Sequence, residues 1–300
     1  MTTTVKILLF GKGGQVGWEL QRSLAPLGKL VAVDFDSTDL CGDFTHPAGL
    51  AETVRQVKPT IIVNAAAHTA VDKAESEPEL ARTINATAPG IIAQEAQRLG
   101  AWMVHYSTDY VFDGSGEQAW TESDQPAPLS VYGQTKWEGE QLVAANCSKH
   151  LIFRTSWVYA ARGGNFAKTM LRLAKERDSL NVIDDQIGAP TGADLLADIT
   201  ALALRQVQTQ PELAGLYHLV ASGHTSWHGY ASLVIEQARQ AGIPLKTLQN
   251  AIHKIATEAY PTPARRPINS RLDTSRLQTA FQVHLPAWQQ GVTRMLTEII

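Results

Sequence analysis

The sequence contains little cysteine, no large excess of either charge and no long hydrophobic run, and each shortage excludes a class of protein. The two cysteines, Cys41 and Cys147, form no Cys-x-x-Cys pair, so neither a disulfide framework nor a zinc site is indicated. With 26 basic and 29 acidic residues, the net charge of −3 predicts no nucleic-acid or anionic-membrane partner. The apolar run 5–10 stops at Gly11, too short for a signal peptide or a membrane span. We therefore expect a soluble, cytoplasmic protein.

The overall composition is that of an ordinary folded protein. Apolar residues make up 44% of the chain and charged residues 18%, which excludes a largely disordered chain. A length of 300 residues suffices for one large domain or two moderate ones.

A glycine-rich turn follows the first apolar run. Residues 5–10 predict a buried strand and residues 18–27 an amphipathic helix, with Gly11, Gly14 and Gly17 between them. Such a turn lets the backbone approach a pyrophosphate, which the free N–H groups of the helix N-terminus then bind. A turn that only connects strand to helix is the alternative interpretation, but the order of elements favours nucleotide binding.

Acidic residues follow the second predicted strand, residues 30–33. Asp34 is placed to hydrogen-bond an adenosine ribose and would repel the 2′-phosphate of NADP, with no basic residue directly after it. Asp43 and Phe44 are candidates to bind the adenine end of the cofactor. An equally good interpretation is that Asp43 is only an exposed loop acid and Phe44 only a buried aromatic.

Strands and helices alternate five times in the first 157 residues. Further strands are predicted at 60–63, 102–107 and 151–157, and the carboxyl ends of the third and fourth deliver 65–69 and Thr108 to one edge of the sheet. His105, inside the fourth strand, reads as a packed residue. The pattern predicts an α/β fold with a Rossmann-like doubly wound parallel sheet.

The second half of the chain has a less regular rhythm. We predict a dinucleotide-binding domain over residues 1–157 and a smaller α/β substrate-binding domain over 158–300, with segments around 179–207 returning to the first sheet. Arg265 and Arg266 lie between prolines and could form a fork for an anionic ligand, or a solvated basic turn.

Tyr132 and Lys136 stand four residues apart in a predicted helix that runs to about residue 145. Their side chains then share one helix face, and a nearby ammonium would lower the pKa of the phenol toward working pH. Alone, this spacing occurs often by chance and favours an ordinary Tyr and Lys on a surface helix. Its predicted position beside the sheet edge that carries the glycine turn favours catalysis.

Together these motifs resemble the extended short-chain dehydrogenase/reductase family, and within it the dTDP-4-dehydrorhamnose reductases. The resemblance spans nearly the whole chain, in segments 9–17, 63–75, 107–112, 154–159, 185–191 and 263–267. It implies reduction of the 4-keto group of dTDP-4-dehydro-L-rhamnose by NADPH or NADH, in nucleotide-sugar and cell-surface polysaccharide (lipopolysaccharide O-antigen) biosynthesis.

The resemblance also implies a role for each matching residue. Thr108 would bind the carbonyl, Tyr132 would protonate it, and Lys136 would hold the nicotinamide ribose. Asp109 and Trp157 would contact the sugar nucleotide, as would Arg265 and Arg266. The implied cofactor-binding residues are Gly11, Gly14, Gln15, Val16, Gly17, Asp34, Asp43, Phe44, Ala67, His68, Thr69, Tyr106, Tyr132 and Lys136.

The resemblance further implies a homodimer and a bound Mg²⁺ ion. The matching metal-ligand positions are Glu19, Asp194 and Glu298, and three solvated surface acids are the alternative.

Two rival functions remain at this point. An epimerase or a 4,6-dehydratase could use the same fold, although the dehydratases need a Glu after the Thr-Asp pair, where this chain has Tyr110. A non-catalytic regulatory subunit is the other rival, and it would have no need of Thr108, Tyr132 and Lys136 together. The sequence does not decide between NADPH and NADH, nor the nucleotide base.

Overall fold

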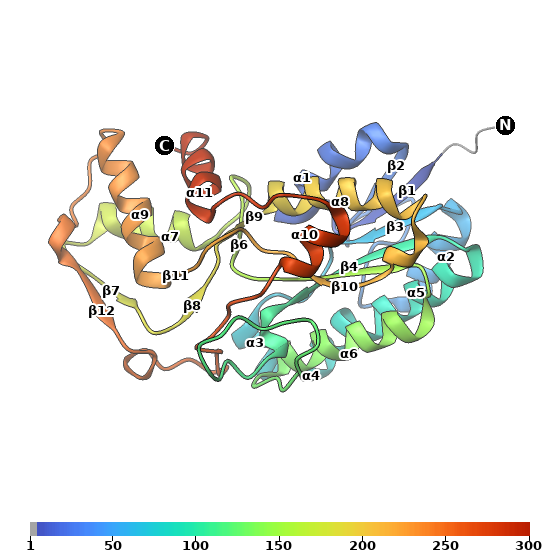
Figure 1. The fold of residues 1–300 in the computed structure, drawn as a ribbon, viewed down its shortest axis with the longest axis horizontal. Helices are drawn as coiled ribbons and strands as arrows, with labels where there is room; N and C mark the ends of the chain where they lie inside the picture. The colour runs from blue at the N-terminus through green and yellow to red at the C-terminus, as the bar shows by residue number, and fades with distance from the viewer. Residues whose placement is uncertain (1–4) are drawn as a thin grey trace.

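The computed structural model describes residues 5–300, and its largest element is a six-stranded parallel sheet (Figure 1). The strand order is β10-β5-β4-β3-β1-β2, which is the arrangement of a doubly wound sheet. The predicted α/β fold is confirmed. The strands are β1 Lys6–Phe10, β2 Lys29–Val33, β3 Ile61–Asn64, β4 Trp102–Thr108, β5 His150–Thr155 and β10 Gly215–His218.

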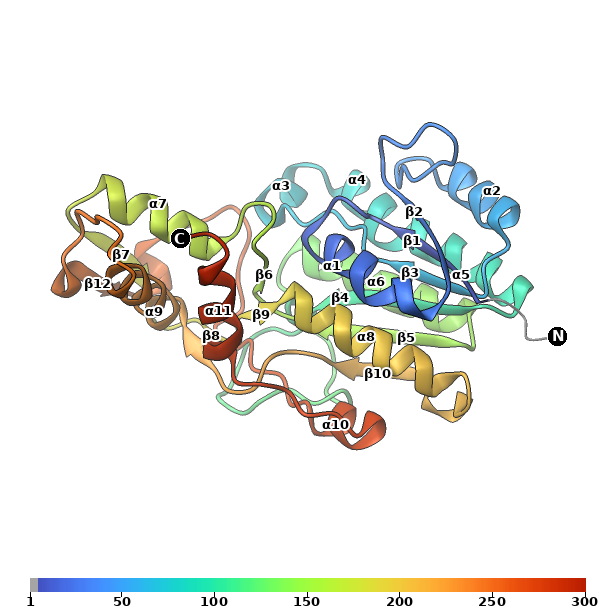
Figure 2. The same cartoon turned by 90° about the horizontal axis from the view of Figure 1, so that it is seen from above.

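Side chains alternate along each strand and so divide the core between two faces of the sheet. In β1, Ile7 and Leu9 pack in one core cluster, and Leu8 and Phe10 in the other. The first face is covered by α1 Gln15–Leu24, α8 Ala193–Val207 and α10 Ser275–Phe281, and Figure 2 shows α1 beside α8. The second face is covered by α2 Pro47–Val57, α5 Ala88–Leu99 and α6 Val131–Asn146.

The segment before β4 is divided into several helical pieces. It comprises α3 Val71–Ser76, α4 Pro78–Arg82 and a π-helical turn, Thr83–Thr87, that leads into α5. The break falls at Glu77, whose φ of −129° is not helical. The following Pro78 disfavours the α conformation of the residue before it, so α3 and α4 do not form one continuous helix.

A smaller group of elements lies beyond the sheet, on the left of Figure 1. The helices α7 Phe166–Glu176, α9 Trp227–Gln240 and α11 Trp288–Thr297 enclose a separate core with one face of β7. Its strands form two-stranded pairs, β7 Leu180–Ile183 with β12 Ile252–Ile255, and β8 Ile187–Gly188 with β11 Thr225–Ser226. A third pair, β6 Val158–Tyr159 with β9 Thr191–Gly192, joins the two parts of the chain.

Two later elements belong to the large sheet. Helix α8 packs on α1, and β10 extends the sheet beyond β5, whereas β7 stays with the smaller group. The division at residues 157 and 158 stays a prediction, with α8 and β10 crossing it. Short 3-10 turns lie at Ala25–Leu27, Asp109–Val111, Pro211–Leu213, Gln249–Ala251 and Thr257–Ala259. Within residues 5–300, no helix is long and apolar enough to cross a membrane.

Candidate active site

A pocket of about 830 Å³ lies at the carboxyl edge of the large sheet. In parallel α/β sheets this edge is where ligands bind, because the loops after the strands meet there. The pocket wall includes residues predicted from the sequence, which come from five strand ends and from helix α6: Gly11, Gly14, Gln15, Val16, Asp34, Asp43, Phe44, Ala67, Thr69, Tyr106, Thr108, Asp109, Tyr132, Lys136 and Trp157.

The glycine turn and helix α1 form one end of the pocket. Helix α1 begins at Gln15 after Gly14, and no side chain caps its N-terminus, so its first N–H groups are available to a phosphate. Gly17 lies behind the wall, because a Cβ there would stand 1.9 Å from the carbonyl oxygen of Gly11. Gly17 therefore lets α1 approach the turn closely and does not itself line the pocket.

Asp34 closes the turn from the tip of β2. Its Oδ2 accepts a hydrogen bond from the Gly13 N–H at 2.7 Å, and its Oδ1 accepts one from the Phe35 N–H at 3.0 Å. Phe35, which is 75% exposed, also lines the pocket, and the sequence motifs did not point to it. An exposed aromatic directly after the strand-end acid was the available signal.

Tyr132 and Lys136 occupy successive turns of α6, as the spacing predicts. The Ser130 hydroxyl caps this helix by accepting from the Gly133 N–H at 3.2 Å. The Lys136 Nζ donates to the Tyr106 carbonyl oxygen at 2.5 Å, and burial lowers the pKa of Lys136 to about 8 against the opposing charge of Glu140.

The expectation that Lys136 brings the pKa of Tyr132 down is not met in this structure. Burial raises the pKa of Tyr132 to about 12, and contact with the Thr108 hydroxyl only partly offsets it. Desolvation of the phenolate is the main cause and the charge of Asp109 adds to it, whereas the ammonium of Lys136, whose Nζ is directed to the Tyr106 carbonyl, does not offset the shift. The phenol is therefore protonated at neutral pH, as a proton donor must be.

Thr108 and Asp109 form a buried pair beside the phenol. The Thr108 hydroxyl donates to Asp109 Oδ1 at 3.0 Å and accepts from the Tyr110 N–H at 3.1 Å. Asp109 is only 2% exposed, and its burial raises the pKa of its carboxyl to about 6. Hydroxyls of Ser270 and Thr108 oppose that shift by contacting the carboxylate.

Several predicted ligand residues stand outside the pocket wall. His68 turns its ring away, with Nε2 3.7 Å from Glu77 Oε2, while its backbone bonds the side chain of Asn85. Arg266 is bound to Asp72 at 2.8 Å, and the exposed Arg265 does not line the pocket.

Tyr106 lines the pocket, but its hydroxyl is engaged elsewhere, in a hydrogen bond of 2.6 Å with Thr200 of α8. His105 is packed against Asn64, as expected.

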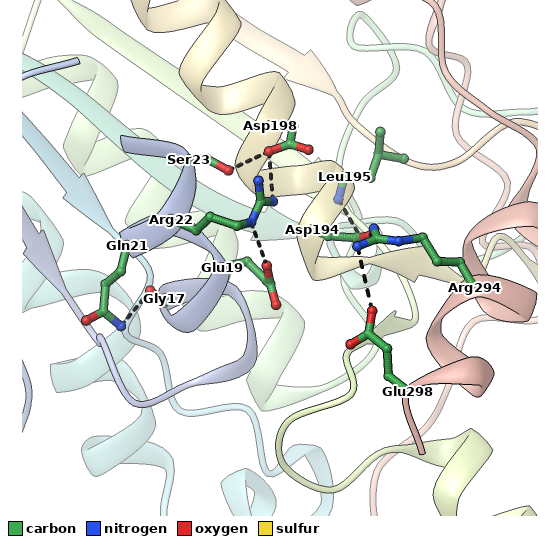
Figure 3. Close-up of polar contacts among 10 residues, drawn as sticks. All are labelled: Gly17, Glu19, Gln21, Arg22, Ser23, Asp194, Leu195, Asp198, Arg294 and Glu298. Atoms are coloured by element: carbon green, nitrogen blue, oxygen red, sulfur yellow. Dashed lines mark hydrogen bonds and ion pairs between the residues drawn. The ribbon is translucent and has the colours of Figure 1, made fainter. Parts of the chain in front are cut away.

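The predicted magnesium ligands surround a small cavity of about 20 Å³ between α1, α8 and α11, but an arginine already stands among them (Figure 3). Arg294 Nη1 lies 2.5 Å from Asp194 Oδ2, and Arg294 Nη2 lies 3.6 Å from Glu298 Oε1. Glu19 is paired with Arg22 at 3.3 Å. Within residues 5–300 no cluster of three His, Cys, Asp or Glu side chains is arranged to hold a metal ion. These residues do not fit a magnesium site.

The fold and this pocket define the class: nicotinamide-dependent oxidoreductases of the extended short-chain type. The model of the family described as RmlD substrate binding domain matches residues 5–300, and the chain belongs to this family of dTDP-4-dehydrorhamnose reductases.

Named relatives support that assignment. The chain is 64% identical over 295 residues to the dTDP-4-dehydrorhamnose reductase of Escherichia coli (strain K12), with 98% of each chain covered. Its fold matches the dTDP-4-dehydrorhamnose reductase from Clostridium acetobutylicum, with a TM-score of 0.87, 36% identity and coverage of 98% and 99%. The enzyme from Bacillus anthracis in complex with NADP gives the same TM-score of 0.87, with 33% identity and coverage of 99% and 100%.

Proposed function

We infer that the chain reduces dTDP-4-dehydrorhamnose to dTDP-L-rhamnose with NADPH or NADH, in the biosynthesis of rhamnose. The observation that carries this inference is the convergence of Thr108, Tyr132 and Lys136 on the same pocket as the glycine turn and the α1 N-terminus. A relative 64% identical over 98% of both chains bears the name of this activity.

The pocket fits a dinucleotide with its nicotinamide toward α6. The first N–H groups of α1, at Gln15 and Val16, would bind the pyrophosphate, and Asp34 and Phe35 the adenosine end. When bound, the reduced nicotinamide supplies a hydride to the carbonyl carbon of the sugar. A relative with 33% identity is described in complex with NADP, and we propose that both NADPH and NADH are accepted here.

The chain's own residues would handle the proton. The hydroxyls of Thr108 and Tyr132 bind the carbonyl oxygen, and Tyr132 donates its proton as negative charge develops on that oxygen. A sugar alkoxide is a stronger base than a phenolate, so a phenol with a pKa of about 12 still donates readily. The ammonium of Lys136, one turn away on α6, then stabilises the phenolate that remains.

The remaining predicted roles are proposals that rest on placement. Asp109 and Trp157 line the pocket beside Tyr132, where a bound sugar would lie. Arg265 and Arg266 lie outside the pocket wall, on a segment that the ion pair between Arg266 and Asp72 anchors. From this segment their side chains would reach a diphosphate that extends out of the pocket. A homodimer and a cytoplasmic location also stay proposals, and sedimentation of the purified protein would test the first.

Oxidation of the cofactor by the purified protein tests the proposed function. The near-ultraviolet absorbance of NADPH or NADH should fall only when both the protein and dTDP-4-dehydrorhamnose are present. A protein that binds nucleotide but oxidises none would favour the epimerase or the regulatory subunit. The 4,6-dehydratase is disfavoured by Tyr110, which cannot replace the Glu that the elimination needs as a base.

A further inference from the structure

One tryptophan from the C-terminal half reaches the pocket. Among the described residues 5–300, the pocket wall takes only Trp227 from beyond Val158, although that half is expected to bind substrate. Trp227 is the first residue of α9, and the Ser226 hydroxyl caps the N-terminus of this helix by accepting from the Gly229 N–H at 3.0 Å. This side chain is the direct contribution of the smaller group of elements to the site.

Trp227 lies flat against Trp157. The ring centroids are 3.6 Å apart and the planes are 13° from parallel, so the two indoles form a close stack. Trp157 has a φ of +48°, in the left-handed region that bulky residues rarely adopt. Gly188 permits the arrangement, because a Cβ there would stand 2.7 Å from Trp157 Cε2. The strained backbone persists because the indole is wedged between Gly188 and Trp227.

Trp227 is itself fixed from behind. Its Nε1 donates to Gln186 Oε1 at 3.0 Å, and Gln186 Nε2 donates to the Thr257 hydroxyl at 3.1 Å. Gln186 is only 3% exposed, and Phe166 packs against Trp227 with a centroid distance of 4.6 Å. The orientation of Trp157 therefore depends on a chain of contacts that begins in the smaller group of elements.

We propose that Trp227 is a positioning residue for the nucleotide sugar: with Gly188 on the opposite face, it fixes the indole of Trp157 so that the free edge of this indole lines the pocket where the deoxysugar ring lies. The proposal rests on the proposed function, because it takes the 4-keto sugar to bind beside Tyr132. A 6-deoxy sugar presents a methyl group and C–H bonds, which pack well against an apolar indole. Fixing that indole in advance lowers the entropy lost when the sugar ring is aligned with Tyr132.

Three variants separate stacking from general packing. Trp227→Ala removes the stack, Trp227→Phe keeps an aromatic ring against Trp157, and Trp18→Phe changes a half-exposed tryptophan outside the pocket as the control. Two stacked indoles produce an exciton couplet in the far-ultraviolet circular dichroism spectrum. We expect Trp227→Ala and Trp227→Phe to lose this couplet and Trp18→Phe to keep it.

Binding and kinetics then test positioning. In Trp227→Ala, the Kd of dTDP-L-rhamnose and the KM of the keto sugar should rise by about ten-fold, the loss expected for one aromatic stack. The Kd of NADPH should stay within about two-fold, and Trp227→Phe should recover most of the sugar affinity.

Two results would overturn the proposal. One is an unchanged affinity for the nucleotide sugar after the couplet is lost, and the other is an equal loss of affinity for the cofactor. The Kd of dTDP-L-rhamnose is measured without turnover. A wild-type protein that binds the sugar nucleotide but oxidises no cofactor would therefore contradict the proposed function and leave the positioning test intact.

Discussion

The Nζ of Lys136 donates to the main-chain carbonyl of Tyr106 at 2.5 Å, which links helix α6 to the middle of strand β4. This bond directs the ammonium toward the sheet, where burial lowers the pKa of Lys136 to about 8. Glu140, one turn further along α6, opposes the shift and is itself held by Arg154 through two hydrogen bonds, of 2.9 and 2.6 Å. The charge of the catalytic lysine therefore depends on a buried ion pair.

This arrangement predicts a basic limb in the pH profile of kcat/KM. Lys136 is an ammonium below about pH 8 and neutral above it, so activity should fall as the pH rises through 8. Glu140→Gln removes the charge that raises this pKa and should move the limb to lower pH. Lys136→Arg keeps a positive charge throughout and should abolish the limb. A limb that stays at the same pH in both variants would show that another group titrates.

The buried carboxyl of Asp109 should lower the stability of the protein while supporting its activity. Burial raises the pKa of this carboxyl, so the charged carboxylate destabilises the fold. This destabilisation is absent at low pH, where the carboxyl is protonated, and it develops as the pH rises from about 4 to 6. Asp109→Asn should therefore raise the free energy of unfolding at pH 7 by up to roughly 3 kcal/mol while lowering turnover. Denaturant unfolding at pH 7 and pH 4 measures this. Equal gains at both pH values would contradict the assignment to this carboxyl.

Much of the site was predictable because it depends on local backbone chemistry. The glycine turn after a buried strand, the acid at the tip of β2 and the i, i+4 pair Tyr132 and Lys136 each follow from spacing, and parallel strand ends must meet at one edge. The α/β alternation likewise predicted the large sheet. The place of β10 as the sixth strand of this sheet does not follow from the sequence pattern, because its pairing with β5 is non-local.

The parts that could not be predicted depend on tertiary packing. Nothing near Trp227 in the sequence indicates that α9 delivers this indole to the pocket. The raised pKa of Tyr132 depends on how deeply the phenol is desolvated, which spacing does not reveal. The magnesium prediction took matching acids as ligands, and only the fold shows Arg294 between two of them (Figure 3).

The two adjacent arginines should differ in their effects. Arg265→Ala should raise the KM for the nucleotide sugar and leave the KM for the cofactor unchanged, because Arg265 is exposed and has no ion pair within 4.0 Å among residues 5–300. Arg266→Ala should act through the broken pair with Asp72, so Asp72→Asn should reproduce its effect. Arg172→Ala, in an exposed pair with Glu176, is the matched control. Identical kinetics for Arg265→Ala and the control would remove Arg265 from the site.

Because Arg294 occupies the predicted metal position, we expect the thermal stability of the protein not to depend on magnesium. Because its guanidinium already neutralises Asp194 and Glu298, the Tm of the wild-type protein should be unchanged by EDTA or by millimolar Mg²⁺. Arg294→Gln should cost up to about 1 kcal/mol, since the pair is largely exposed, and should make the Tm rise with Mg²⁺. Arg172→Gln serves as the control. A wild-type Tm that falls with EDTA and recovers with Mg²⁺ would restore the metal site.

The most direct test of the account follows a deuterium atom from the cofactor. Purified protein would be given dTDP-4-dehydrorhamnose and NADPH deuterated at the transferable position of the nicotinamide, with Tyr132→Phe alongside and Tyr260→Phe, an exposed tyrosine, as the control. We expect deuterium at carbon 4 of the rhamnose product, turnover at least about 10²-fold lower in Tyr132→Phe with NADPH binding retained, and wild-type turnover in Tyr260→Phe. Product without deuterium at carbon 4, or near-normal turnover in Tyr132→Phe, would contradict it.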